Sequence, residues 1–256
     1  RAQKDERTRM FLSPKSIVWQ TESVENSHLL LENKSKQIPL CGTQGCVMKN
    51  QGGNAGILLD FGQELHGGLE FSVRSITGSK EASFRIRFGE SVTEAMSELG
   101  GKTNATNDHA LRDFTAELVD YSDMTFGNTG FRFVRLDFMG RAEIKSILAV
   151  NHIFHKNPVF RYEGPDDRIR AIYEAAKRTV DLCVSSGFVW DGIKRDRLVW
   201  IGDMHPEMLA LTTLYGRLPA IERSLDFVKD QTPLPGWMNG YPMYSMWWII
   251  ILVLLF

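Results

Sequence analysis

The sequence predicts a protein of the β plus α class, in which an antiparallel β-sandwich precedes a set of helical hairpins. Between about residues 56 and 154, apolar and polar residues alternate along short segments, which is the period of strands that bury one face. After residue 164, apolar residues recur at spacings of three and four, which is the period of an amphipathic helix. This change of period places a β-sandwich domain at 1–160 and a helical domain at 161–256.

The strands of the first domain are expected to be short and separated by glycine turns. The clearest strand patterns lie at 69–74, 84–88, 131–138 and 144–154. Turns are expected at Gly67 and Gly68, at Gly78, and at Gly100 and Gly101. Residues 1–50 are less well defined and could end a preceding domain, with possible short strands at 16–19 and 28–31.

The second domain is expected to begin with three helices that form αα-hairpins. The first follows Asp166, the second opens at Pro206 and ends at Gly216, and the third runs from Pro219 to Asp230. The apolar run 246–256 is too short for a membrane span, which needs roughly 18 residues, and is expected to be a truncated core helix. Such a run would expose apolar surface unless further chain covered it.

Composition excludes several classes of partner. The 256 residues carry a formal net charge of -1, and acidic and basic residues are interspersed, so neither nucleic acid nor a membrane surface is an expected ligand. The three cysteines lack the spacing of a zinc or redox motif; unpaired thiols and a Cys41–Cys46 disulfide are both possible. No signal pattern is seen, and the compartment stays open between cytoplasmic and periplasmic or secreted.

The segment 191–203 concentrates charged residues and a tryptophan between two expected helices. Its carboxylates are Asp191, Asp196 and Asp203, and its cations are Lys194, Arg195 and Arg197. Carboxylates beside an aromatic surface suit sugar hydrolysis, which needs a proton donor, acceptors for hydroxyl groups and an apolar wall for the ring. An interhelical salt-bridge loop is the alternative interpretation.

This segment resembles the signature of the α-L-rhamnosidases of glycoside hydrolase family 78. The matching residues keep the order Asp191, Arg195, Asp196, Arg197, Leu198, Trp200, Gly202 and Asp203. Upstream, the segments 59–67, 88–90 and 130–134 resemble strands of the family's accessory sandwich. Together the matches cover roughly residues 56–205.

The resemblance implies an inverting α-L-rhamnosidase, truncated within an (α/α)6 barrel of the six-hairpin glycosidases. Asp191 and Asp203 would bind rhamnose hydroxyls. Asp196 would be the general acid, although this signature is one residue shorter than the usual form and lacks its glutamate. The family's general base lies in later hairpins, beyond Phe256, so the chain alone is expected to be inactive.

Further residues are candidates for the site. Arg195, Trp200 and Trp237, the last on the loop 235–241, are expected to contact substrate, and core packing is the alternative for both tryptophans. Glu207 and Glu222 are expected to face solvent or form ion pairs, residues 107–109 to form a capping turn, and His205 could influence Asp203. No metal site or cofactor is expected.

Two other functions are compatible with the sequence. The chain could be a non-catalytic carbohydrate-binding fragment, or part of another six-hairpin glycosidase with a different sugar specificity. A carbohydrate is the expected partner in each case. The sequence does not indicate the oligomeric state.

Overall fold

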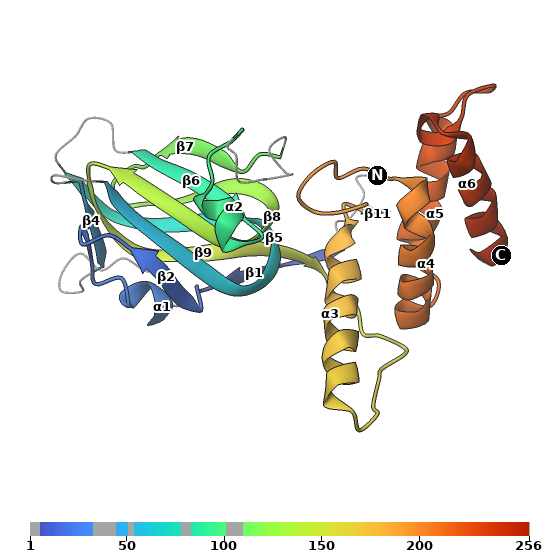
Figure 1. Ribbon diagram of the computed structural model, residues 1–256, viewed down its shortest axis with the longest axis horizontal. Coiled ribbons are helices and arrows are strands. Elements are labelled where there is room, and N and C mark those ends of the chain that lie inside the picture. The colour runs from blue at the N-terminus through green and yellow to red at the C-terminus, as the bar shows by residue number, and fades with distance from the viewer. Residues whose placement is uncertain (1–5, 33–44, 51–53, 78–82, 101–109, 256) are drawn as a thin grey trace. The chain divides into compact units, whose positions relative to one another are not determined.

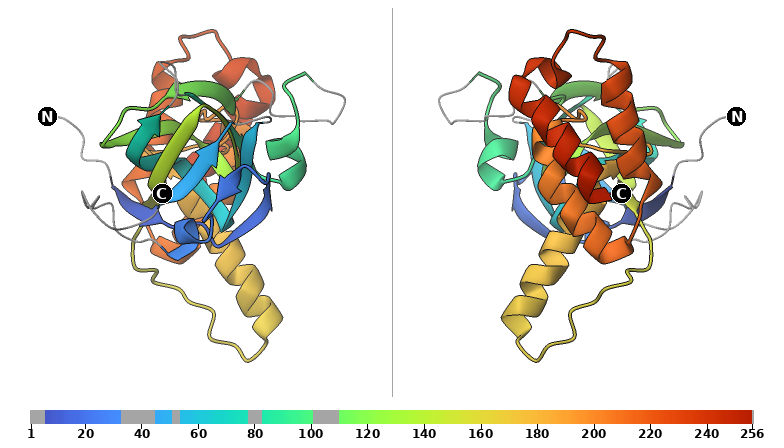
Figure 2. Two further views of the ribbon diagram at one scale, coloured as in Figure 1. Left: turned by 90° about the vertical axis from the view of Figure 1, so that its left-hand side faces the viewer. Right: turned by 90° about the vertical axis from the view of Figure 1, so that its right-hand side faces the viewer.

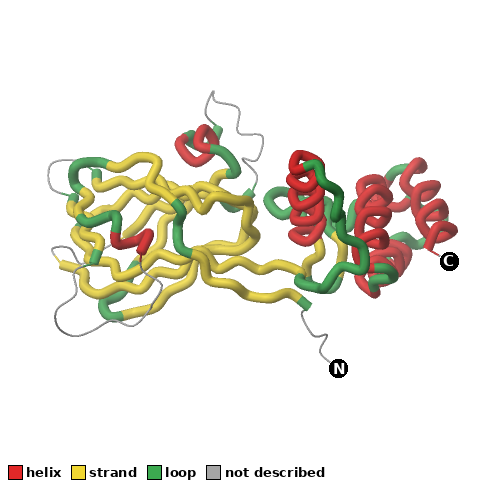
Figure 3. The backbone as a smooth tube through the Cα atoms, turned by 90° about the horizontal axis from the view of Figure 1, so that it is seen from below, coloured by secondary structure: helices red, strands yellow, loops and turns green. Residues whose placement is uncertain are grey.

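The computed structural model describes residues 6–32, 45–50, 54–77, 83–100 and 110–255. It divides into two compact units (Figure 1). The unit Arg9–His152 consists mainly of strands, and the unit Ile153–Phe256, together with the segment before Arg9, consists mainly of helices (Figure 3).

The β unit is a mostly antiparallel sheet with a sandwich-like core. Its strands are β1 (Arg7–Leu12), β2 (Ser16–Gln20), β3 (Val24–Glu25), β4 (Cys46–Lys49), β5 (Ala55–Thr77), β6 (Ser83–Gly89), β7 (Asp113–Glu117), β8 (Ser122–Met139) and β9 (Arg141–Phe154). Neighbours in the order β3-β4-β9-β5-β8-β6-β7 run antiparallel, β2 pairs antiparallel with β5, and β1 pairs with β9. Buried residues from β4, β5, β6, β8 and β9 form one core cluster.

The long strand β5 organises this sheet. It pairs with β8 from Ala55 to Val73, with irregularities after Asp60 and Gly67, while its first half also pairs with β2 and its second half with β9. β5 therefore has β8 as its neighbour along one edge, and β2 and β9 at different positions along the other edge. The strand predictions at 16–19, 69–74, 84–88, 131–138 and 144–154 are confirmed within β2, β5, β6, β8 and β9.

Gly67 and Gly68 do not form the expected turn, because both lie inside β5 at an irregularity of its pairing. A Cβ atom on Gly67 would lie 1.9 Å from the carbonyl oxygen of Val150, and one on Gly68 would lie 2.3 Å from that of Gly127. These glycines allow neighbouring backbones to approach closely.

Two short helices also differ from expectation. The expected strand at 28–31 is wrong, because Leu29–Glu32 forms helix α1, where Leu30 is buried. Helix α2 (Val92–Met96) was not predicted; the hydroxyl of Ser91 accepts a hydrogen bond from Glu94 N, a capping interaction. Cys46 and Cys183 are buried free thiols, whereas Cys41, Gly78, Gly101 and residues 107–109 lie outside the described residues.

An ion pair joins two of the segments that resemble the rhamnosidase sandwich. Arg132 on β8 donates hydrogen bonds from Nε and Nη2 to the two carboxylate oxygens of Asp60 on β5, at 2.8 and 2.9 Å. Asp60 Oδ1 also accepts a bond from Gly62 N. The pKa of Asp60 is lowered, first by the hydrogen bond from Arg132, against the opposing effect of burial. The two motifs therefore have a structural role.

The helical unit contains α3 (Asp167–Cys183), the hairpin β10 (Val184–Ser185) and β11 (Phe188–Val189), α4 (Ile201–Tyr215), α5 (Pro219–Asp230), the short helix η1 (Met238–Gly240) and α6 (Pro242–Leu255). The predicted first and third helices are confirmed. The small hairpin between α3 and α4 was not predicted, and it is tied to α5 because Val189 N donates to Ser224 Oγ at 2.9 Å.

The second helix starts earlier than expected, at Ile201 and not at Pro206. The side chain of Asn239 holds this start: its Oδ1 accepts a hydrogen bond from Ile201 N, and its Nδ2 donates one to Val199 O, both at 3.2 Å. A Cβ on Gly202 would lie 2.5 Å from the Tyr244 ring, so glycine allows α6 to pack against α4 (Figure 2). Asp203 therefore lies in the first turn of a helix.

Helix α6 is confirmed, but it is not a buried core helix. Within Pro242–Leu255, only Ile251 is buried. Its exposed apolar residues are Met243, Met246, Ile249, Ile250, Val253 and Leu254. Among the described residues, no helix combines the length and apolarity that crossing a membrane requires.

Replacing Asp60 with asparagine is expected to destabilise the β unit by about 1–2 kcal/mol at pH 7, because a hydrogen-bonded pair with a charged group is lost. The lowered pKa of Asp60 means that its contribution is present above the unfolded pKa and disappears as the pH falls through the folded pKa. Urea unfolding at pH 7 and pH 3 measures both effects. If the free energies of unfolding of the parent and the Asp60→Asn variant differ by the same amount at pH 7 and pH 3, the charge of Asp60 does not stabilise the β unit.

Asn239 has a positive φ of 50° as well as two side-chain hydrogen bonds. Asn239→Gly removes only the amide and is expected to cost about 1–3 kcal/mol, whereas Asn239→Ala is expected to cost roughly 1 kcal/mol more, because alanine disfavours this backbone conformation. Urea unfolding of the two variants separates the contributions. If both variants are as stable as the parent, Asn239 does not anchor α4.

Candidate functional site

The loop that carries the predicted signature is closed at its base by Asp191. Leu198 N donates to Asp191 Oδ1 at 2.7 Å, and Asp191 N donates to Leu198 O at 3.0 Å. Within the loop, Ile193 and Lys194 are buried, whereas Arg195 and Asp196 are exposed. The loop is therefore anchored by one apolar and one charged side chain, and it presents Asp196 to solvent.

The backbone at the exposed end of this loop is strained. Asp196 and Arg197 have φ values of 54° and 55°, in the left-handed region that residues other than glycine rarely adopt. Such residues cost on the order of 1–3 kcal/mol each and persist where the surrounding structure requires them. This strain marks the loop as a candidate functional segment.

The predicted carboxylates share one electrostatic neighbourhood. Burial raises the pKa of Asp191, and the negative charges of Asp196 and Asp203 raise it further, while the hydrogen bond from Leu198 N opposes the shift. Asp203 is exposed in the first turn of α4. Asp191 is therefore within electrostatic range of both Asp196 on the loop and Asp203 on the helix.

Glu207 is a fourth member of this group that the sequence interpretation missed. It is half-buried one turn after Asp203, and its side chain forms no ion pair or hydrogen bond with any described residue. Its pKa is raised to about 8, first by burial and then by the charges of Asp203 and Asp191. Among the described residues Glu207 thus lacks the ion pair that was one of its two expected roles, and the solvent-facing role stays a prediction. The spacing of four residues would place Asp203 and Glu207 on the same face of a helix. That signal could be used only if the helix began before Asp203, whereas the expected start was Pro206.

Ion pairing accounts for only part of the acidic group. Arg195 Nε lies 3.8 Å from Asp196 Oδ2, and the two side chains are 53% and 36% exposed, so the contact contributes little. Asp203 has no cationic partner among the described residues. Glu222, in contrast, pairs with Arg217 as expected. The salt-bridge interpretation thus explains neither Asp203 nor Glu207.

Aromatic rings lie beside Asp203. The ring of Trp200 is 5.9 Å from that of Tyr244 and 6.3 Å from that of Tyr241. Burial raises the pKa of Tyr244, and the charge of Asp203 raises it further, which places this ring within range of the carboxylate. Tyr244 was not predicted. Partly exposed rings beside carboxylates can contact the apolar face of a sugar.

The remaining predicted residues are placed as follows. Trp237, on the loop before η1, is exposed, with a relative accessibility of 56%. His205 packs its ring 4.8 Å from that of Trp247 on α6. Among the described residues, no group of three or more histidine, cysteine or acidic side chains is arranged to hold a metal ion.

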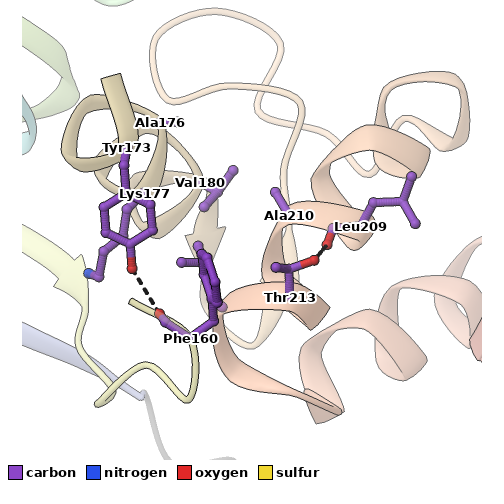
Figure 4. A pocket seen from close by; sticks show the side chains of 9 residues that line it. Phe160, Tyr173, Ala176, Lys177, Val180, Leu209, Ala210 and Thr213 are labelled. Carbon is purple, nitrogen blue, oxygen red and sulfur yellow. Dashed lines mark hydrogen bonds between the residues drawn. The ribbon is translucent and has the colours of Figure 1, made fainter. Parts of the chain in front are cut away.

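Two pockets in the helical unit have other linings. One of about 380 Å³ lies between α3 and α4, and its walls are mostly apolar (Figure 4). Its lining residues are Phe160, Tyr173, Ala176, Lys177, Val180, Leu209, Ala210, Thr213 and Leu214. A second, of about 270 Å³, shares Tyr173 and Lys177 with it. Neither pocket is lined by Asp191, Asp196 or Asp203, so the acidic group lies outside both of these cavities.

Comparison with known proteins agrees with the fold suggested by the sequence motifs. No protein-family model matches the sequence, and no curated protein matches it. The structure is similar to a rhamnosidase from Klebsiella oxytoca with rhamnose bound, with a TM-score of 0.69 and 18% identity, over 96% of this chain and 51% of that one. It is similar to a GH78 family rhamnosidase of Bacillus sp. GL1 with a TM-score of 0.65 and 20% identity, over 88% of this chain and 23% of that one.

A third similar structure is an α-L-rhamnosidase from Dictyoglumus thermophilum, with a TM-score of 0.57 and 17% identity, over 84% of this chain and 26% of that one. The chain thus spans about half the length of the first of these proteins and about a quarter of the other two. The resemblance to α-L-rhamnosidases that the sequence motifs suggested is confirmed at the level of the fold.

Proposed function

We propose that this chain is part of a glycoside hydrolase that cleaves terminal α-L-rhamnosyl residues with inversion, and that its helices belong to an (α/α)6 catalytic barrel. The observation that supports this most strongly is the similarity to a rhamnosidase along nearly the whole chain, combined with a strained loop that presents Asp196. The similarity in fold does not by itself assign a substrate.

In this proposal Asp196 protonates the glycosidic oxygen. It is exposed at the end of a loop whose base is fixed by Asp191, so its carboxyl group can approach a bound sugar. Asp191 and Asp203 accept hydrogen bonds from sugar hydroxyls, and Arg195 contacts the same ligand. Trp200 and Trp237 offer ring faces to the apolar side of the sugar.

Inversion also requires a second carboxylate roughly 6.5–9.5 Å from the acid, where it can activate water. We propose that this base comes from later hairpins of the barrel, as the resemblance implies. The Klebsiella oxytoca protein is about twice the length that the similarity covers, which leaves room for such hairpins in a protein of that kind.

Sugar binding tests the first part of the proposal. Isothermal titration of the chain with L-rhamnose is expected to show binding, and Asp203→Asn is expected to weaken it about tenfold, since hydrogen bonds to a charged group contribute about 1.5–3 kcal/mol. Asp230→Asn is a matched control, because Asp230 is exposed on α5. Equal affinity in the Asp203 variant would remove this residue from the sugar site.

Leaving-group dependence tests Asp196 as the acid in a protein that carries this chain and a complete barrel. Asp196→Asn is expected to lower kcat about 10²–10⁴-fold for a rhamnosyl disaccharide, whose alcohol leaving group needs a proton. The loss should be much smaller for 4-nitrophenyl α-L-rhamnoside, whose leaving group departs as an anion. Equal losses on both substrates would contradict the assignment, and binding without hydrolysis by the parent would favour the carbohydrate-binding alternative.

A further inference from the structure

The two cavities of the helical unit share a wall. Tyr173 and Lys177, one turn apart on α3, line both of them. The cavity of about 380 Å³ is mostly apolar and lies between α3 and α4, where side chains of the two helices face each other (Figure 4). The cavity of about 270 Å³ is lined by α3 and by residues of the segment 155–163, which precedes this helix. A ligand that extends past Tyr173 and Lys177 would therefore contact both linings.

The segment 155–163 is held in place by both helices. Val159 N donates to Leu214 O on α4 at 2.7 Å. The hydroxyl of Tyr173 on α3 donates to Phe160 O at 2.8 Å, as the dashed line in Figure 4 shows. The rings of Phe160 and Tyr173 also meet edge to face, with their centres 6.0 Å apart. The shape of both cavities is therefore fixed by defined contacts.

The apolar cavity has the size and lining of a small-molecule site. Such sites have volumes of roughly 300–1,000 Å³ and are lined mainly by apolar and aromatic side chains. Here the aromatic rings come from Phe160 and Tyr173, and aliphatic side chains come from Val180 and Leu209. Aromatic rings pack edge to face or in offset stacks, so these two rings offer surfaces to a third one. The cavity therefore suits an aromatic ring.

The charge of Lys177 is already balanced within the helical unit. Its Nζ donates to Asp181 Oδ2 at 2.6 Å, and Asp181 also accepts a hydrogen bond from the hydroxyl of Tyr215. Asp181 is buried, so this contact holds the ammonium group in one place. The methylene chain of Lys177 remains to line the two cavities. Lys177 therefore does not make either cavity a site for an anion.

The other charged residues of the polar cavity balance one another. With histidine counted as neutral, they are two cations, Lys156 and Arg161, and two acids, Glu163 and Glu174. The side chains of Arg161, Glu163 and Glu174 form no ion pair or hydrogen bond with a described residue. A phosphate or carboxylate ligand would favour an excess of cations. Donors and acceptors without net charge match hydroxyl groups, which both donate and accept.

We propose that the two cavities together bind an aryl glycoside, with its aromatic ring between α3 and α4 and its sugar beside the segment 155–163. Leu209 follows Asp203 by six positions on α4, which is about 9 Å along the helix axis. Asp191 and Asp196 line neither cavity, and nor does Asp203. This site is therefore separate from the proposed rhamnoside site, and the inference goes beyond the proposed function.

The test is isothermal titration of the full chain with phenyl β-D-glucopyranoside, a probe that carries no rhamnose. It is expected to bind at least tenfold more tightly than methyl β-D-glucopyranoside, which lacks the ring. Ala176→Leu and Ala210→Leu narrow the apolar cavity from α3 and from α4, and each should weaken binding of the phenyl glucoside about tenfold. The matched control is Ala175→Leu, which changes the neighbouring exposed alanine outside both linings and should keep the affinity of the parent.

The polar cavity is tested with the same probe. Glu174→Ala removes an acceptor and should weaken binding about fivefold, whereas Glu174→Gln keeps an acceptor oxygen and should stay within about twofold of the parent. Thermal unfolding of each variant confirms folding. Absence of binding, equal affinities for the phenyl and methyl glucosides, or parental affinity in both leucine variants would overturn the inference. Parental affinity in Glu174→Ala would overturn the placement of the sugar. A failure to bind L-rhamnose is a distinct result, which concerns only the proposed function.

Discussion

The side-chain amide of Asn239 bridges Val199 O and Ile201 N, and these two hydrogen bonds set the residue at which α4 begins. Because α4 starts before Asp203, this carboxylate is held by a helix and not by a loop. The same start places Glu207 one turn further along the same face. The arrangement of the acidic group therefore depends on a residue 38 positions away from Ile201 in the chain.

Like charges brought together in this way oppose folding. The pKa values of Asp191 and Glu207 are both raised by burial and by neighbouring carboxylates, so the folded state retains protons that the unfolded chain would release. The positive φ angles of Asp196 and Arg197 add backbone strain in the same segment. A loop with only a structural role would gain nothing from these costs, whereas perturbed carboxylates are typical of sites that handle protons.

The β unit shows the opposite use of charge. Asp60 and Arg132, from two motifs far apart in the sequence, form a two-point ion pair between neighbouring strands. Here opposite charges lower the pKa of Asp60 and stabilise the fold. The motifs that resemble α-L-rhamnosidases therefore contain two kinds of residue. Asp60 and Arg132 hold neighbouring strands of the β unit together, whereas Asp191, Asp196 and Asp203 belong to the acidic segment 191–203.

The sequence by itself determined the strands at 69–74 and 84–88, the helices after Asp166 and from Pro219, and the family resemblance, because hydrophobic period and motif order are properties of neighbouring residues. Only the tertiary structure decided the start of α4, the place of Glu207 among the aspartates and the strand position of Gly67. Each of these depends on a group distant in the chain: the Asn239 amide, the Asp191 carboxylate or the Val150 carbonyl. Local pattern carries no information on such contacts, since they form only when the elements pack.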